Sequence, residues 1–345
     1  MLKLDCYSPE QRFRDLKRRE NIELDPLLRT ARAAADAAAA VHRQDAGKVL
    51  VGEASIKSRA DYVSQTDLAA QAAAISVIEE YHPDHLILAE ESDEPLQDQL
   101  ARWDGCPLWI VDPLDGTANF LHNHPLYCSS IALAVDDRPV VGAITSAPSG
   151  ERWWAAEGIG AFKNGKPISV SKEHQLINSM AGTGFPFKLL DVLPEYLEEF
   201  DRILRATSGI RRGGSAALDL CYLAQGSLDV FWEKILMPWD FAAGLVLLRE
   251  AGGAAARPDG SELGLGPGPV CCANSPELLR ELLEVLGLAR NWTVTNHQPT
   301  SGNLGVSVLT YLDRTTLGLR NFWHVNRQDT IFEKGVDILS ANGSW

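Results

Sequence analysis

The stretch "WIVDPLDGTANF", residues 109–120, contains two carboxylates at the end of an apolar run. A short apolar run of this kind, bounded by polar residues, is typical of a buried strand. Asp112 ends the run, and Asp115 follows three positions later, on the far side of Pro113. The proline ring fixes its own backbone and favours an extended conformation for the residue before it. We therefore expect Asp112 and Asp115 to lie on a tight, stiff turn where both side chains converge on one point.

The residues that follow this pair are suited to an anion. Gly116 allows a ligand to approach the backbone closely, and Thr117 is placed to begin a helix, whose N-terminus offers free N–H groups. Two neighbouring carboxylates without a His or Cys ligand favour Mg²⁺ or Mn²⁺ over zinc. The stretch therefore predicts a magnesium site beside a phosphate-binding turn. Taken alone, it also fits an ordinary solvated Asp-Pro turn.

The composition is that of an ordinary globular protein. The chain has 345 residues, 45% of them hydrophobic and 23% charged, which suggests about two domains or two fused layers. A formal net charge of -14 argues against a nucleic-acid partner, because no basic face is evident. It leaves an anionic substrate open, since metal ions can supply positive charge. No run of about 18 apolar residues is present, so no membrane partner is expected.

Cysteine usage and the N-terminus both bear on the compartment. Neither a Cys-x-x-Cys spacing nor another metal pattern is found among Cys6, Cys106, Cys128, Cys221, Cys271 and Cys272. We therefore expect reduced cysteines that pack as small hydrophobic residues. The N-terminus lacks the apolar core of a signal sequence. Together these features predict a cytoplasmic protein.

Helices and strands are predicted along most of the chain. Helix propensity with start and stop signals predicts helices over residues 25–46, 66–82, 193–207, 215–226, 239–253 and 275–287. Strands are predicted within residues 85–92, 108–115, 129–148, 152–171 and 227–233, with turns at residues 136–139 and 164–165. We divide the chain into an extension (1–22), an α+β half with most metal ligands (23–172), an α/β half with substrate residues (173–290) and an atypical tail of unknown role (291–345).

Other acids lie where predicted elements begin or end. Glu90 ends a second short strand, whereas Asp67 and Asp240 stand at the starts of two helices. An acid at a helix N-terminus is most often a cap. Capping does not easily explain all of them together with Asp112 and Asp115. Ligands of open α/β sheets collect beyond the carboxyl ends of the strands, so we expect these acids to share one site.

Four segments together resemble the inositol monophosphatase family of Mg²⁺-dependent, lithium-sensitive phosphatases. They are "AEES" (89–92), "WIVDPLDGTANF" (109–120), "GGSAALDLCYLAQGSLDVFWE" (213–233) and "WDFAAGLVLLREAGG" (239–253). Their order and spacing match from about residue 25 to 288, with most similarity to bacterial inositol-1-monophosphatases. The resemblance implies an α/β fold, a layered α-β-α-β-α sandwich of the inositol monophosphatase / fructose-1,6-bisphosphatase type. It also implies a homodimer.

The resemblance implies two or three Mg²⁺ ions, for which Mn²⁺ could substitute. Glu90, Asp112 and the backbone carbonyl of Leu114 would hold one ion. Asp112, Asp115 and Asp240 would hold a second ion. All of these ligands are hard oxygen donors, as Mg²⁺ prefers.

Catalytic and substrate-binding roles are implied in the same way. Asp67 and Glu90 would border a third, weaker metal position. Gly116 and Thr117 would bind the phosphate through backbone amides, with the Thr117 hydroxyl near the attacking water. The substrate side would be formed by Gly214, Ser215, Ala216, Glu233 and Asp240. Glu233 occupies the position that holds inositol hydroxyls in inositol-specific members.

The resemblance implies a phosphatase that hydrolyses inositol 1-phosphate, a small phosphorylated polyol, by direct in-line attack of metal-activated water. No Ser or Cys nucleophile beside a base is evident, so no phosphoenzyme is expected. One alternative is the same chemistry on fructose 1,6-bisphosphate, histidinol phosphate or 3′-phosphoadenosine 5′-phosphate, because related enzymes share the metal motifs. Another is a non-catalytic regulatory protein on the same fold. Loss of some of these carboxylates would favour the non-catalytic alternative, but none of them is missing from this sequence.

Three further motifs have simpler interpretations. "GAFKNGKP" (160–167) ends in proline where a P-loop has Ser or Thr, so a hairpin is expected. His122 and His124 follow oxygen ligands and are expected to be structural. Arg211 and Arg212 could contact an anionic substrate, but a solvated or interface position is the expected one.

Overall fold

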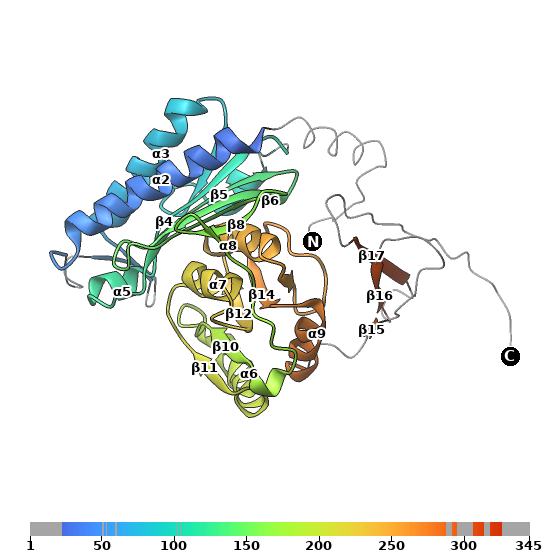
Figure 1. Cartoon of the computed structure of the whole chain (residues 1–345). Helices are drawn as coiled ribbons and strands as arrows, with labels where there is room; N and C mark the ends of the chain where they lie inside the picture. The colour runs from blue at the N-terminus through green and yellow to red at the C-terminus, as the bar shows by residue number, and fades with distance from the viewer. Residues whose placement is uncertain are drawn as a thin grey trace, which may run out of the picture.

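The computed structural model describes residues 23–49, 52, 54–58, 61–101, 103, 105–287, 292–294, 306–313 and 318–325. The predicted extension 1–22, which includes Cys6, lies outside the described residues, as does most of the predicted tail 291–345. Figure 1 shows that helices and two large sheets alternate through the molecule.

Two helices form the first layer. Helices α2 (Leu24–Asp45) and α3 (Gln65–Tyr81) lie side by side on one face of the larger sheet (Figure 1). The buried face of α2 is mostly alanine, with Ala31, Ala34 and Ala38 fully buried at helical spacing. Because alanine combines high helix propensity with a small side chain, it both favours the helix and allows close packing on the sheet.

The larger sheet has seven strands in the order β3-β4-β5-β6-β7-β8-β9. Their bounds are β3 (Leu86–Ala89), β4 (Leu108–Asp115), β5 (Cys128–Val135), β6 (Arg138–Thr145), β7 (Arg152–Ala156), β8 (Gly160–Lys163) and β9 (Lys166–Pro167). The β3–β4 pair is parallel, and the other pairs are antiparallel. The predicted turns at Asp136-Asp137 and Asn164-Gly165 both have two successive positive φ angles, which suits a tight hairpin.

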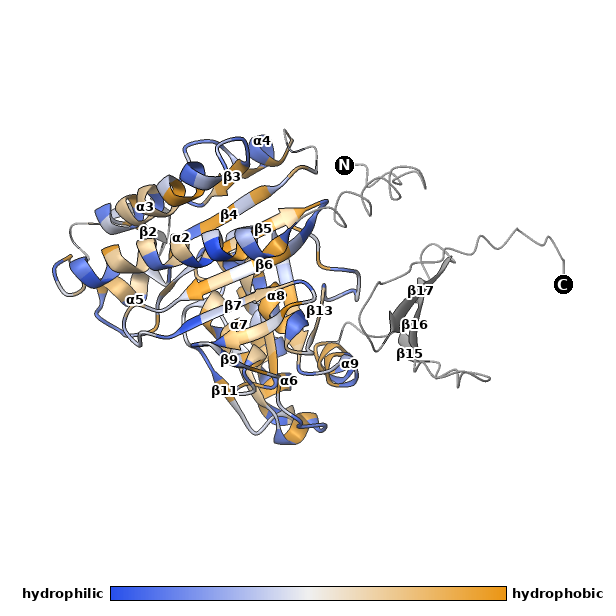
Figure 2. Ribbon diagram, turned by 45° about the horizontal axis from the view of Figure 1, so that its top comes forward, coloured by the Kyte–Doolittle hydropathy of each residue, from blue (hydrophilic) through white to orange (hydrophobic). Residues whose placement is uncertain are grey.

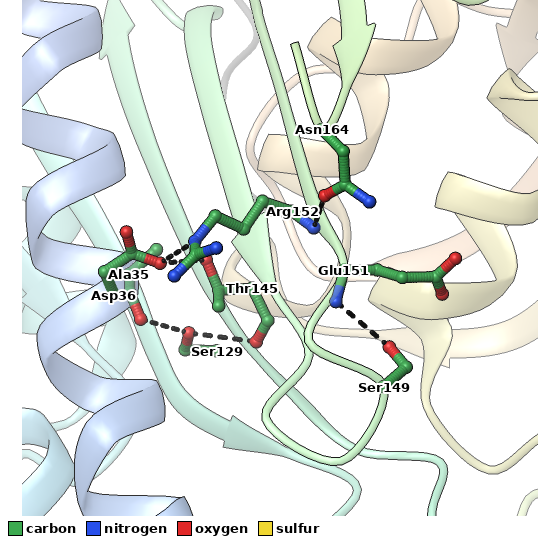
Figure 3. Close-up of polar contacts among 8 residues, drawn as sticks. All are labelled: Ala35, Asp36, Ser129, Thr145, Ser149, Glu151, Arg152 and Asn164. Atoms are coloured by element: carbon green, nitrogen blue, oxygen red, sulfur yellow. Dashed lines mark hydrogen bonds and ion pairs between the residues drawn. The ribbon is translucent and has the colours of Figure 1, made fainter. Parts of the chain in front are cut away.

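Polar contacts attach α2 to the larger sheet near the ends of β6 and β7 (Figure 3). The Asp36 carboxylate accepts hydrogen bonds from Thr145 Oγ1 (3.1 Å) and from Arg152 Nε (2.6 Å). Ser129 Oγ donates to the Ala35 carbonyl (2.8 Å). The buried hydroxyls of Ser129 and Thr145 are thus satisfied, and sliding of α2 along the sheet would break these bonds.

The middle layer consists of α7 (Ala216–Ala224) and α8 (Pro238–Glu250), which lie between the two sheets (Figure 1). Both helices are buried on nearly all sides, as a helix covered on both faces must be. Figure 2 shows hydrophobic colouring along the strands of the larger sheet and along α8. Packing is close here, since a Cβ placed on Gly142 of β6 would lie 2.5 Å from the Ala243 carbonyl oxygen of α8.

The smaller sheet has five strands in the order β11-β10-β12-β14-β13. They are β10 (Met180–Thr183), β11 (Gly209–Arg211), β12 (Val230–Leu236), β13 (Ala254–Ala256) and β14 (Gly268–Ala273). Helices α6 (Leu193–Ala206) and α9 (Pro276–Val285) form the last layer against it. Ser275 caps α9 as its sequence suggests, accepting from Leu278 N (3.2 Å). This order of layers confirms the predicted α-β-α-β-α sandwich.

The remaining elements are short. They are β1 (Ser55–Ser58), β2 (Asp61–Val63), α4 (Leu96–Ala101), α5 (Thr117–Leu121) and the 3-10 turns Leu176–Asn178 and Leu190–Val192. In the tail, β15 (Trp292–Val294), β16 (Val306–Asp313) and β17 (Gly318–Val325) pair as an antiparallel sheet of their own. The chain passes from the larger to the smaller sheet between residues 167 and 180, and the division at residue 172 stays a prediction. Among the described helices, none combines the length and the apolar character needed to cross a membrane.

Candidate active site

The central segment "DPLD" is the bulged end of a strand. Strand β4 continues through Asp115, with Asp112 opposite Ser130 and Asp115 opposite Cys128, so three steps on β4 face two steps on β5. The predicted tight turn is therefore wrong. Proline has no N–H to donate, and a bulge is where a strand tolerates it. The bulge still brings the two carboxylates to one side, as the turn was expected to do.

Two hydrogen bonds stabilise the bulge. His42 Nε2, on the fully buried side of α2, donates to the Pro113 carbonyl over 2.8 Å. Leu114 N donates to Asp112 Oδ1 over 3.0 Å, which fixes the direction of that carboxylate. The contact from His42 spans 71 positions of sequence, and nothing in the local pattern around His42 predicts it.

Three carboxylates converge on the bulge. One carboxylate oxygen each from Asp112, Asp115 and Asp240 lies within 4.8 Å of the others. Asp240 comes from the first turn of α8, where its Oδ2 also accepts from Met237 N (2.6 Å). Asp240 is thus both a helix cap and a member of the cluster. Glu90, just beyond β3, extends the parallel ladder through its N–H to the Val111 carbonyl (3.1 Å) and hydrogen-bonds to Asp112 through its side chain.

The pKa values of the clustered acids show that their negative charges need protons or a cation nearby. Burial raises the pKa of Asp112 well above its usual value, and the negative charges of Glu90, Asp115 and Asp240 raise it further. Burial also raises the pKa of Asp240, with Asp115 as the next cause. Such acids repel one another unless protons or a cation intervene. Because the donor atoms are hard oxygens, the set fits Mg²⁺ or Mn²⁺.

Asp115 is positioned by the N-terminus of α7. Its Oδ2 accepts from Ser215 Oγ (2.5 Å) and from Ala217 N (2.8 Å). These bonds oppose the effect of burial, which raises the pKa of Asp115. Ser215 also caps α7 by accepting from Leu218 N (3.3 Å). Sequence reasoning placed Ser215 against the substrate and missed its contact with the cluster.

Asp67 lies beside the same cluster. It accepts hydrogen bonds from Ser64 N (2.8 Å) and Ser64 Oγ (2.6 Å), and it is therefore also a helix cap. Thr117 Oγ1 donates to Asp67 Oδ1 (2.9 Å) and lies 3.1 Å from the Leu114 carbonyl. Gly116 has φ 95°, and a Cβ there would lie 2.9 Å from the Leu126 carbonyl, so glycine is required at this position. Thr117 begins α5, as predicted.

The predicted substrate residues lie on the side of the smaller sheet. Gly214 has φ +87°, and Asn119 Nδ2 holds this loop by donating to the Gly213 carbonyl (3.0 Å). Ala216 begins α7 and is buried. Glu233 lies on β12, and burial raises its pKa to about 8. A Cβ on Gly184 would overlap the Glu233 carboxylate, so the backbone just after β10 lies directly against it.

Among the described residues, the hairpin, the two histidines and the cysteines contribute no ligand to this cluster. Residues 160–167 form the expected hairpin of β8 and β9. His122 and His124 are outside the group of acids that could share an ion. Five cysteines lie within the described residues, and all are free thiols: Cys106, Cys128, Cys221, Cys271 and Cys272.

Known proteins are similar to this chain in sequence and in fold. The chain matches the Inositol monophosphatase family over residues 23–289. An inositol-1-monophosphatase of Synechocystis sp. is 40% identical over 68% of this chain and 80% of that protein. The Nus factor SuhB of Pseudomonas aeruginosa is 35% identical over 73% of this chain and 93% of that protein. A crystal structure of the extragenic suppressor protein suhB from Bartonella henselae has a TM-score of 0.70 and 35% identity, covering 76% of this chain and 98% of that chain.

These matches agree with the layered sandwich. The chain belongs to the inositol monophosphatase family. The resemblance inferred from the four sequence segments is confirmed, and so is the fold class.

Proposed function

We propose that the protein is a Mg²⁺-dependent phosphatase that hydrolyses inositol 1-phosphate. The observation that carries the proposal is the convergence of Asp112, Asp115 and Asp240, with Glu90 beside them, in one buried cluster. These acids come from separate elements of two layers, and capping alone does not require them to meet. A phosphate ester and its cations supply the positive and negative charges that complete such a site.

The ligand set is the one that the family resemblance implies. Glu90, Asp112 and the Leu114 carbonyl would hold one ion, and Asp112, Asp115 and Asp240 a second. When bound, Mg²⁺ polarises a water and neutralises phosphate oxygens. Ser215 and Ala217 N keep Asp115 directed at the ions.

Thr117 is the group that would orient the attacking water. Its hydroxyl is held between Asp67 and the Leu114 carbonyl. Asp67 and Glu90 would border the proposed third, weaker metal position. The backbone amides of Gly116 and Thr117 would bind the phosphate. Direct attack by water on phosphorus then needs no covalent enzyme intermediate.

Inositol phosphate is the substrate favoured by the predicted substrate residues on the side of the smaller sheet. Glu233, with Gly214 and Ala216, would contact the ring hydroxyls. Among the proteins matched by sequence are some named inositol-1-monophosphatase and others named Nus factor SuhB. The second name favours a regulatory function as the alternative, but the complete carboxylate set supports catalysis. A homodimer, inhibition by Li⁺ and a cytoplasmic location belong to the same proposal and rest on family membership.

The test is a panel of phosphate esters assayed with Mg²⁺ and with excess chelator. We expect hydrolysis of inositol 1-phosphate that needs Mg²⁺ and that falls at least about a hundredfold in Asp112→Asn. Mg²⁺ should also raise the Tm of the wild type but not that of the variant, because binding to the native state stabilises it. Asp201→Asn, an exposed acid on α6, is the matched control.

Two results would contradict the proposal. Activity that survives both the chelator and Asp112→Asn would exclude metal catalysis at this cluster. Hydrolysis of another ester at least about tenfold faster, with inositol 1-phosphate left intact, would exclude the substrate and keep the chemistry.

A further inference from the structure

A second group of charged side chains lies next to the metal-binding acids. It consists of Asp219 on α7, Glu233 on β12 and Arg212 in the loop before α7. Asp219 is only 3% exposed. Within the described part of the chain, neither carboxylate accepts a hydrogen bond or forms an ion pair, and Arg212 has no hydrogen-bonded acceptor. A charged side chain without a protein partner beside a proposed active site is available to a ligand.

Each carboxylate lies against a glycine, where a larger residue would leave no room for it. Asp219 Oδ1 lies 2.9 Å from where a Cβ on Gly213 would stand, and the Glu233 carboxylate lies against Gly184. After burial, the negative charge of Asp219 is the largest cause that raises the pKa of Glu233. Asp115 has the corresponding effect on Asp219. Asp219 therefore lies near both Asp115 and Glu233.

Arg212 is held where it can reach both carboxylates. Its guanidinium lies over the ring of Phe187 (4.9 Å) and near that of Phe185 (5.7 Å). Its Nη1 is 2.5 Å from the Cβ position of Gly214. Its positive charge opposes the raised pKa values of Asp219 and Glu233, so it lies near both. Contact with two aromatic rings orients the guanidinium without using its N–H donors.

The two carboxylates and the guanidinium determine which chemical group of a ligand can bind between them. Two carboxylates need donors, and one guanidinium needs an acceptor. A hydroxyl group supplies both at once.

We propose that Asp219 and Arg212 are specificity-determining residues that bind, with Glu233, the hydroxyl groups of the substrate on the side away from its phosphate. The proposal rests on the proposed phosphatase function. It favours a polyol ester among the candidate substrates.

The test compares two esters in the Mg²⁺-loaded full chain. Inositol 1-phosphate carries ring hydroxyls, whereas p-nitrophenyl phosphate carries none. In Asp219→Asn and in Arg212→Gln we expect KM for inositol 1-phosphate to rise about tenfold or more, since each loses a charged hydrogen bond. For p-nitrophenyl phosphate, kcat/KM should stay within about twofold of the wild type. The exposed pair on α6 supplies the matched controls Asp201→Asn and Arg205→Gln, which should behave as the wild type.

Calorimetric binding of inositol 1-phosphate to the Mg²⁺-loaded protein separates the two proposals. If the wild type binds the ester without hydrolysing it, the proposed function fails, and weaker binding by both variants still supports the hydroxyl site. An equal loss for both esters in Asp219→Asn would show that Asp219 positions Asp115 and would overturn the inference. So would unchanged KM values in folded variants, or a wild type that binds no ester.

Discussion

His42 is a fully buried histidine whose protonation would oppose folding. It donates to the Pro113 carbonyl, and burial lowers its pKa from 6.5 to about 4. Between pH 6.5 and about pH 4, His42 is protonated in the unfolded chain but stays neutral in the folded protein. The stability from this group is therefore complete above about pH 6.5 and is lost as the pH falls toward 4.

We predict that His42 lowers the free energy of unfolding by about 2 kcal/mol between pH 7 and pH 5. His42→Gln keeps an N–H donor but does not titrate, so its stability should fall less over this range. Urea unfolding of both proteins at the two pH values, without Mg²⁺, measures the difference. Equal changes in the two proteins would show that the protonation of His42 is not coupled to folding.

The sequence predicts the acids of the candidate site better than the residues that support them. Asp112, Asp115 and Asp240 are found because each ends or begins a recognisable element. His42 and Asp219 are missed because each lies inside a helix, and their importance comes from contacts that cross many residues of sequence. A helical pattern reports the burial of such a residue but not its partner.

At the level of elements, the contact between β6 and α8 depends on the absence of a side chain. Gly142→Ala should lower the free energy of unfolding by about 1–3 kcal/mol, because its Cβ would stand against the backbone of Ala243. Gly52→Ala is the matched control, since a Cβ there meets nothing within 4 Å. Chemical denaturation should show a change below about 0.5 kcal/mol for the control. Similar effects in both variants would mean that the two layers can separate slightly without loss.

Long elements and tight turns are predictable from this sequence, and short ones are not. The helices around α2, α3, α8 and α9 and both hairpin turns lie where propensity and turn residues place them. Strands β10, β11 and β13 were missed because they are three or four residues long and rich in Gly and Ala. Such segments become strands through neighbours in the sheet, which no local pattern contains. The bounds of β4 were predicted, but the bulge inside it was not, since the bulge is set by pairing with β5.

At the scale of the whole molecule, the sandwich is complete before the tail begins. The hydrophobic clusters of the described residues all lie between Leu24 and Leu286. We predict that a chain ending at Gly287 keeps the Tm and the Mg²⁺ response of the full chain, as thermal unfolding with and without Mg²⁺ would show. A chain ending at Asn274 is the control. It lacks α9, whose buried Leu278 and Leu282 each contribute about 2 kcal/mol, and should be strongly destabilised. Loss of stability in the longer version would contradict the prediction.

The acids of the proposed metal site are divided between layers of the sandwich. Asp112 and Asp115 belong to the larger sheet, Asp240 to the middle helices, and Glu233 beside them to the smaller sheet. An intermediate in which each layer has formed but has not yet docked would keep these groups too far apart to share one ion. Cation binding would therefore require that the layers have docked. A partly folded chain would lack the site and could not hydrolyse a phosphate ester.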